Sequence, residues 1–229
     1  RPARSGPMTE DSRPVAIPRV SARQLVPAIL PLWVRGLILL CCLIEGGLLL
    51  TGLLGYPIAR QAAFMLGGFW SPLFLDGPGL YPGQGISMFL TYGLLHGGLL
   101  HLAMNMISLA AVARELNRMV GAARMAAIYV ASQVGGALLF ALMQPQAGPM
   151  VGASGAVFGL AAALVGHATI TLRRRQRSTA PLVRAVALIL GLNIALTLLL
   201  PSIAWEAHLG GAATGLILGL FFALGRRAS

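Results

Sequence analysis

The chain has 229 residues, of which 57% are hydrophobic and only 10% are charged. A soluble domain carries roughly 25% charged residues, and several apolar runs here reach the roughly 20 residues that a helix needs to cross a bilayer, so the composition excludes an ordinary soluble protein. The formal net charge of +11 would suit a nucleic-acid partner if the basic residues formed one patch. They lie instead in short clusters between apolar runs, which indicates a polytopic membrane protein with no nucleic-acid partner.

The first 30 residues differ in composition from the rest of the chain. Residues 1–30 are rich in Arg and Pro and lack an apolar core, so we expect a flexible cytoplasmic tail rather than a signal peptide. A transit peptide is the alternative for so arginine-rich a start. Residues 31–229 then form one domain, an all-α bundle of six transmembrane helices. The six apolar segments cover residues 33–55, 97–114, 124–143, 154–172, 182–201 and 207–225.

The first segment and the loop after it carry unusual residues. Glu45 lies inside the first segment, where an acid marks function by default, and we expect it to contact another helix or water. The loop from Tyr56 to about His96 is long and rich in aromatic residues, Pro and Gly. Because Trp and Tyr favour the membrane interface, we expect a structured element that rests there. Asp76 lies in this loop without a predicted role.

The arginines orient the bundle. All 17 basic residues are Arg, and every one except Arg60 falls on the same side if six segments alternate across the membrane. Basic loops stay in the cytoplasm, so we expect both termini there and a location in the bacterial inner (plasma) membrane.

With this topology, the second, fourth and sixth helices all enter from the non-cytoplasmic face. His101 and Asn105 lie in the first turns of the second helix, Ser154 opens the fourth, and His208 opens the sixth. At 1.5 Å per residue, each lies within roughly 10 Å of its helix entrance. Polar groups in a membrane usually face the bundle interior or a water-filled cavity, so these four predict a shared site.

Ser154 and His208 are the candidates for nucleophilic chemistry. Small residues around the serine let another group approach its hydroxyl, and histidine can take the proton near neutral pH. Both residues also begin stripes of small residues, which permit close helix contact and would bring the two side chains together. The alternative for the same residues is ordinary helix packing. The stripes are Gly155, Gly159, Ala162 and Gly166 in the fourth helix, and Gly211, Gly215 and Gly219 in the sixth.

His101 and Asn105 are four residues apart and share one helical face. Both can donate hydrogen bonds, which an oxyanion developing on a carbonyl requires. The alternative is an interhelical polar clamp without chemistry.

The remaining polar residues define what the site lacks. Glu206 is two residues before His208 and points away from it, so we infer a Ser–His dyad without an acid. We expect a structural hydrogen bond for His96, whereas His167 lies too far toward the cytoplasmic end. The two adjacent cysteines have no His or acidic neighbours at metal-ligand spacing, and we expect neither a metal nor a cofactor.

Together these pieces resemble the rhomboid family of intramembrane serine proteases, in its six-helix prokaryotic form. The matching stretches are 101–105, 152–155 and 207–211, and the resemblance runs from roughly residue 33 to 225. It implies that Ser154 is the nucleophile and His208 the base. It also implies an oxyanion hole made of the Ser154 amide, His101 and Asn105, with Gly152, Gly155 and Gly211 as structural neighbours. The first loop departs from the family in lacking an evident Trp-Arg pair, its nearest feature being Phe69-Trp70.

The resemblance implies an endopeptidase that cleaves transmembrane segments of membrane proteins near the non-cytoplasmic face through an acyl-enzyme. The partners would be the lipid bilayer and transmembrane substrates that enter sideways, because a helix in lipid has its backbone hydrogen-bonded. The fifth helix, 182–201, would be the mobile gate. A catalytically silent rhomboid-like chaperone is one alternative, although it should lack the Ser or the His. A small transporter is another, but its polar sites would lie at the midplane.

Overall fold

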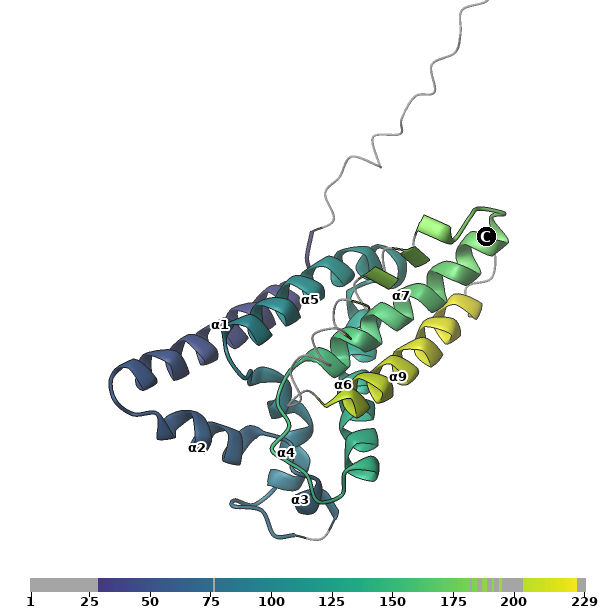
Figure 1. Ribbon diagram of the computed structural model, residues 1–229. Coiled ribbons are helices and arrows are strands. Elements are labelled where there is room, and N and C mark those ends of the chain that lie inside the picture. Colours follow the sequence, from purple (N-terminus) through teal and green to yellow (C-terminus); the bar gives the residue numbers. More distant parts are fainter. Residues whose placement is uncertain are drawn as a thin grey trace, which may run out of the picture.

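The computed structural model describes residues 29–75, 77–181, 183, 184, 187, 188, 191, 194 and 204–225. In these residues the regular structure is helical, so the predicted all-α class is confirmed for the described chain (Figure 1). The elements are α1 (Leu32–Leu53), α2 (Ile58–Gly67), α3 (Ser71–Leu75), α4 (Gln84–Thr91), the 3₁₀ helix η2 (Tyr92–Leu94), α5 (Leu99–Val120), α6 (Ala122–Met143), α7 (Ser154–Arg174) and α9 (Trp205–Leu224).

Five of these helices are long and apolar enough to cross a membrane. They are α1, α5, α6, α7 and α9, and they match five of the six predicted segments. The predicted fifth segment, 182–201, and with it the predicted gate, falls mostly outside the described residues. The chain is thus an integral membrane protein with five candidate spans in its described part.

The second span is longer than the sequence predicts. We expected it to end at 114, where charged residues begin, but α5 continues through them to Val120. Arg114, Glu115 and Arg118 are compatible with a helix because Arg and Glu are good helix formers and exposed side chains remain solvated. The helix ends instead at Gly121, whose φ of +85° suits a residue without a Cβ.

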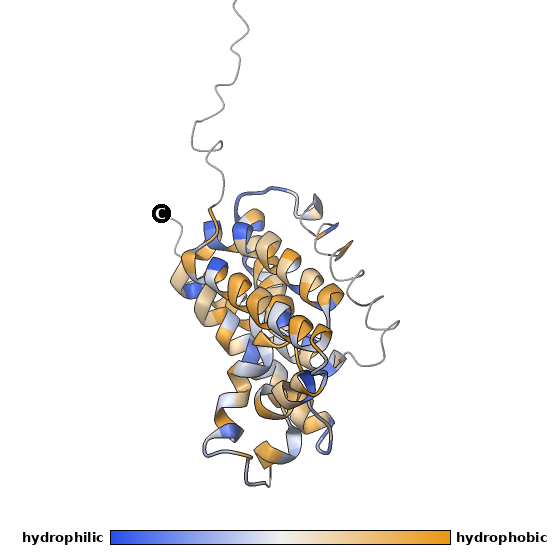
Figure 2. Cartoon of the chain, turned by 90° about the vertical axis from the view of Figure 1, so that its left-hand side faces the viewer, coloured by the Kyte–Doolittle hydropathy of each residue, from blue (hydrophilic) through white to orange (hydrophobic). Residues whose placement is uncertain are grey.

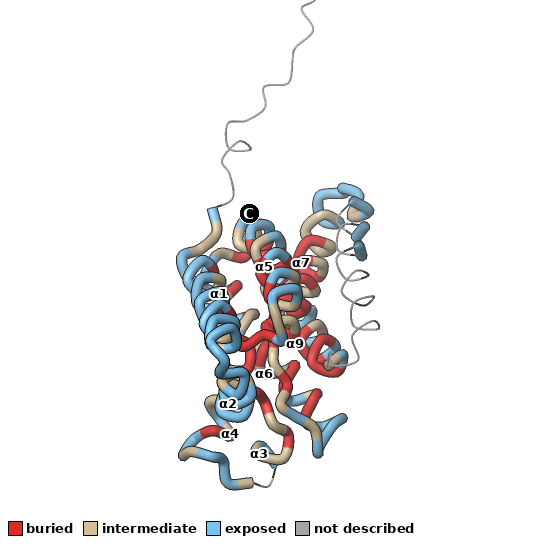
Figure 3. The backbone as a smooth tube through the Cα atoms, turned by 60° about the vertical axis from the view of Figure 1, so that its left-hand side comes forward, coloured by how far each residue is buried: buried red, intermediate tan, exposed pale blue. Residues whose placement is uncertain are grey.

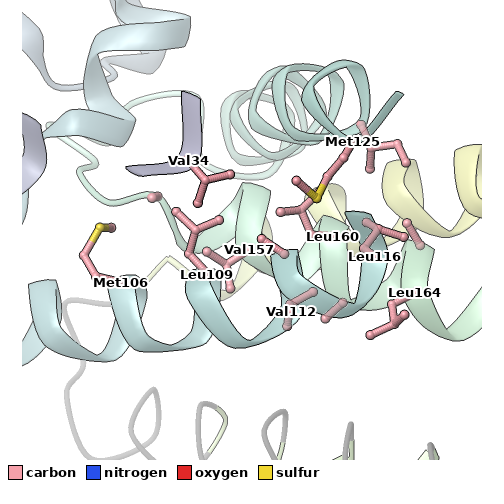
Figure 4. Packing of buried hydrophobic residues seen from close by; sticks show 14 of the residues in the cluster. Val34, Met106, Leu109, Val112, Leu116, Met125, Val157, Leu160 and Leu164 are labelled. Carbon is pink, nitrogen blue, oxygen red and sulfur yellow. The ribbon is translucent and has the colours of Figure 1, made fainter. Parts of the chain in front are cut away.

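α7 lies at the centre of the bundle, in contact with α5, α6 and α9. Figure 3 shows its backbone largely buried, whereas α1 and α2 are mostly exposed. Apolar side chains from α1, α5, α6 and α7 fill the space between the helices, as Figure 4 shows for Leu109, Val157 and Leu160. The long helices also carry exposed apolar residues, such as Leu43 and Phe221, which suits contact with lipid. Figure 2 shows these helices coloured as hydrophobic over most of their length.

α7 and α9 touch through their backbones. At three positions on α9 a Cβ would overlap a carbonyl oxygen of α7, so only glycine permits the observed approach. The two predicted stripes therefore do pack against each other. One member was wrong: Ala162 is only half-buried, and the fully buried Ala163 takes its place because it continues the four-residue spacing. The pairs are Gly211 with Gly155, Gly215 with Gly159, and Gly219 with Ala163.

The loop between α1 and α5 is structured, as the sequence predicts. It folds into α2, α3, α4 and η2, which gather at one end of the bundle (Figure 1). Phe69 and Tyr92 from this loop are buried against Phe140 of α6. Phe69 also exchanges two backbone hydrogen bonds of 2.9 Å with Met150, just before α7. The loop is thus attached directly to the segment that leads to Ser154, while Asp76 lies outside the described residues.

Candidate active site

Ser154 is the first residue of α7, and its approach segment is held by the first loop. The N–H of Gly152 donates a hydrogen bond of 2.9 Å to the carbonyl of Tyr92. Gly152 itself has a φ of +125°, a conformation that residues with a Cβ rarely adopt. As the first helical residue, Ser154 has a backbone N–H without an intrahelical acceptor. The serine therefore presents two groups at the start of α7, its hydroxyl and a backbone N–H that makes no hydrogen bond within the helix.

His208 lies in the first turn of α9, opposite Ser154. Its Nε2 is 2.7 Å from the Ser154 Oγ, a hydrogen-bond distance. The imidazole also stacks on Phe158, one turn into α7, with ring centroids 4.3 Å apart and planes inclined by 7°. The ring is therefore fixed from two directions, and the backbone contact of α7 with α9 sets the separation of the two helices. The sequence analysis missed Phe158, although its position four residues after Ser154 places it on the same helical face.

No carboxylate in the described residues bonds to His208. Glu206, the nearest acid in sequence, is buried and accepts a hydrogen bond of 2.8 Å from Gln144 Nε2 at the end of α6. This contact turns Glu206 away from the imidazole, as its two-residue offset predicts. The sequence gives no signal for Gln144, because the contact joins residues 62 positions apart.

His101 lies in the first turn of α5 with its ring against the approach segment of Ser154. Its Nδ1 accepts a hydrogen bond of 3.3 Å from the N–H of Gly97. In a neutral imidazole one nitrogen accepts and the other donates, so the proton of His101 is on Nε2. A Cβ on Gly152 would lie 2.8 Å from Cε1 and 2.9 Å from Nε2 of this ring. The donor edge of His101 therefore faces the segment before Ser154.

Asn105 lies one turn beyond His101 and is buried. Its Nδ2 donates a hydrogen bond of 2.9 Å to the carbonyl of His101 in the same helix. An amide nitrogen has two protons, so one of them remains for another acceptor.

The other two histidines make no contact with Ser154 or His208 that the described residues show. The structural hydrogen bond expected for His96 is present at its backbone carbonyl, which accepts from Arg60 at 3.0 Å. Burial, and secondly the nearby His101, lower the pKa of His96 to about 4, so its ring is neutral at physiological pH. His167 contacts Thr171 near the far end of α7, away from the site as predicted.

Comparison with known proteins finds similarity to one family. The Rhomboid domain model matches residues 83–225. The chain is 38% identical over 130 residues to RHOMBOID-like protein 4 of Arabidopsis thaliana, which covers 57% of this chain and 32% of the relative. It is 32% identical over 127 residues to Rhomboid-type serine protease 2 of Emericella nidulans, covering 55% and 25%. With Rhomboid protease GluP of Bacillus subtilis it shares 31% identity over 134 residues, covering 58% and 24%. The matched stretch thus spans about a quarter to a third of these relatives.

Proposed function

The chain belongs to the Rhomboid family, and we propose that it is an intramembrane serine endopeptidase with a Ser154–His208 dyad. The observation that carries this proposal is the 2.7 Å contact between Ser154 Oγ and His208 Nε2. A serine hydroxyl becomes a useful nucleophile when an adjacent base takes its proton. Two of the relatives carry the words serine protease or protease in their names, which supports the same chemistry here.

The reaction follows from the positions of the donors and acceptors. His208 takes the proton of Ser154 as the hydroxyl oxygen attacks a peptide carbonyl, and it then gives that proton to the leaving amine. Water then attacks the acyl-enzyme while His208 takes its proton, and His208 returns that proton to Ser154 Oγ as the acyl–oxygen bond breaks and the acid product leaves. The negative oxygen of each tetrahedral intermediate would accept hydrogen bonds from the Ser154 amide, from His101 Nε2–H and from Asn105 Nδ2–H.

The substrate class follows from the location of the site within a membrane protein. Ser154 and His208 both lie in the first turn of their helices, so a cleaved peptide bond would lie near one face of the membrane. We propose that this is the non-cytoplasmic face, because the arginine distribution favours a cytoplasmic location for both termini. A transmembrane substrate must unwind locally before its backbone can react, because a helix in lipid has every backbone group hydrogen-bonded.

The dyad is tested by removing each partner. Ser154→Ala and His208→Ala should each abolish cleavage of a model transmembrane substrate in detergent or liposomes, with thermal stability retained. Residues that act as a unit are non-additive, so the double variant should be hardly slower than either single one. Ser108→Ala, at another buried serine in α5, is the matched control and should remain active. Substantial cleavage by purified Ser154→Ala would contradict the proposal.

A fluorophosphonate probe separates the protease from the other classes. A reactive serine in this chain should be labelled, and Ser154→Ala should remove the label. A silent rhomboid-like chaperone or a transporter would show no labelling of the parent protein at all. The close Ser154–His208 contact supports the enzyme, since neither alternative requires it.

The oxyanion donors are tested separately. Loss of one such donor typically costs about 10²–10³ in rate, or roughly 3–4 kcal/mol. We expect a larger loss in kcat for His101→Ala than for Asn105→Ala, because one amide proton of Asn105 is occupied by its own helix. Both variants should still react detectably with the probe. If both instead lose thermal stability and keep full turnover when folded, the pair is a structural clamp.

A further inference from the structure

One arginine of the first loop joins three parts of the chain next to His101. Arg60, from α2, donates from Nη2 to Glu45 Oε1 at 2.7 Å and from Nη1 to Glu45 Oε2 at 3.0 Å. The same Nη1 donates to the carbonyl of His96 at 3.0 Å. Arg60 thus connects α1, the first loop and the turn that leads into α5. This is the contact that Glu45 makes, where the sequence predicts only a helix or water contact.

The ion pair is deeply placed for a charged group. The Glu45 side chain is 1% exposed and that of Arg60 is 29% exposed. A buried charge is costly unless its partner has good geometry and its remaining hydrogen-bonding groups are satisfied. The planar guanidinium meets both conditions, since it binds both carboxylate oxygens and still has a proton for the His96 carbonyl. A lysine ammonium lacks the planar fork that binds both carboxylate oxygens of Glu45 in parallel.

The peptide group that accepts the hydrogen bond from Arg60 also contacts His101. The carbonyl of His96 and the N–H of Gly97 belong to one peptide group, and in a trans peptide they point in opposite directions. On one side this group accepts from Arg60, and on the other it donates to His101 Nδ1 at 3.3 Å. Hydrogen bonds in series polarise one another, so the arginine also strengthens the donor that faces His101.

We propose that Glu45 and Arg60 are positioning residues, which act on the reaction through the His96–Gly97 peptide and His101. The peptide keeps the proton of His101 on Nε2 and holds that edge of the ring beside Gly152. This proposal rests on the proposed function, in which His101 Nε2–H stabilises the oxyanion. It assigns a role to the acid inside the first span and to the one arginine on the predicted non-cytoplasmic side.

The test removes both charges together. Glu45→Leu with Arg60→Leu leaves no unpaired buried charge, and such apolar replacements are often neutral for stability. Misplacing a catalytic group by about 1 Å can cost about 10²-fold, so we expect kcat to fall by about tenfold to 10²-fold with KM little changed. The single variant Arg60→Lys keeps a positive charge beside Glu45, so its kcat should fall less than that of the double leucine variant but stay below that of the parent protein. Glu115→Gln breaks the exposed Arg118–Glu115 ion pair at the far end of α5 and is the matched control, which should keep full activity.

A double-mutant cycle decides whether the effect passes through His101. In a His101→Ala background the two leucine replacements should slow the reaction by less than about twofold, because their target is already absent. In an Asn105→Ala background the full loss should remain. Equal losses in the His101→Ala and parent backgrounds would overturn the proposal. If the leucine variant does not fold, the same cycle is run with Arg60→Lys.

A spectroscopic measurement separates this proposal from the proposed function. ¹⁵N NMR of histidine-labelled protein, assigned by comparison with His101→Ala, should show His101 protonated on Nε2 and not on Nδ1. The leucine variant should shift this ring toward a mixture of tautomers. An unchanged tautomer in that variant would overturn the positioning role even if the parent protein cleaves substrate. In another outcome, the parent protein cleaves nothing while the leucine replacements still produce the expected tautomer shift. That result would contradict only the proposed function.

Discussion

Replacement of Gly152 by alanine should displace His101, the proposed oxyanion donor, while leaving the His101 and Ser154 side chains unchanged in chemistry. Gly152 has a φ of +125°, and a Cβ there would lie 2.8 and 2.9 Å from two atoms of the His101 ring. The new methyl group would therefore impose two penalties, one on the backbone and one on the imidazole.

The two penalties have different magnitudes and different readouts. A non-glycine residue in a sparsely populated backbone region costs about 1–3 kcal/mol, which lowers the free energy of unfolding. To reach ordinary van der Waals distance, the His101 ring must also retreat by about half an ångström. Catalytic groups must be held within about 0.5 Å of their productive positions, so we expect kcat to fall by about tenfold to 10²-fold. That loss corresponds to about 1.4–2.7 kcal/mol of transition-state stabilisation.

Gly121→Ala is the matched control for the Gly152→Ala measurement. Gly121 also has a positive φ, +85°, but a Cβ there would meet nothing within 4 Å. Thermal unfolding and cleavage of a model substrate are measured for both variants in the same detergent. Both should lose stability, and only Gly152→Ala should lose turnover per folded enzyme. Parent-like turnover in Gly152→Ala, or an equal loss in Gly121→Ala, would refute the reasoning.

Two further results are expected. Phe158→Leu removes the aromatic stack on His208, and since such pairs are worth about 0.5–1.5 kcal/mol, kcat should fall by about twofold to tenfold; an unchanged kcat would show that the α7–α9 contact alone orients the imidazole. In a cysteine-free background, Arg175→Cys should be protected from impermeant thiol reagents in intact cells and Gly79→Cys should be labelled. The opposite labelling pattern would reverse the proposed orientation.

The parts of the fold and site that follow from local sequence were predictable. Span positions depend on runs of apolar residues, and the approach of Ser154 to His208 followed from two glycine stripes with a four-residue period. The end of α5 was not predictable in this way, because charged residues at a helix end can belong to either the helix or the loop. Its true end at Gly121 depends on one backbone conformation.

The contacts that sequence reasoning missed join residues far apart in the chain. Glu45 could be recognised as unusual, but its partner lies on another helix, and the sequence marks Arg60 only as the exception in the charge distribution. His96 was expected to make a structural hydrogen bond, and it is the backbone carbonyl that makes it, with Arg60. No side-chain pattern reports where a carbonyl points, so only the folded structure reveals the link from Arg60 to His101.

The order of the two dyad residues along the chain has a consequence during synthesis. His208 follows Ser154 by 54 residues and lies on a separate helix. At about 5–20 residues per second, the ribosome needs about 3–11 s to pass from the serine to the histidine. Throughout that interval Ser154 lacks His208 as a hydrogen-bond partner, and it gains this partner only when α9 has inserted and its glycines have docked on α7. If the proposed function holds, the nascent chain lacks the base that Ser154 needs, and activity would begin only when the bundle is complete.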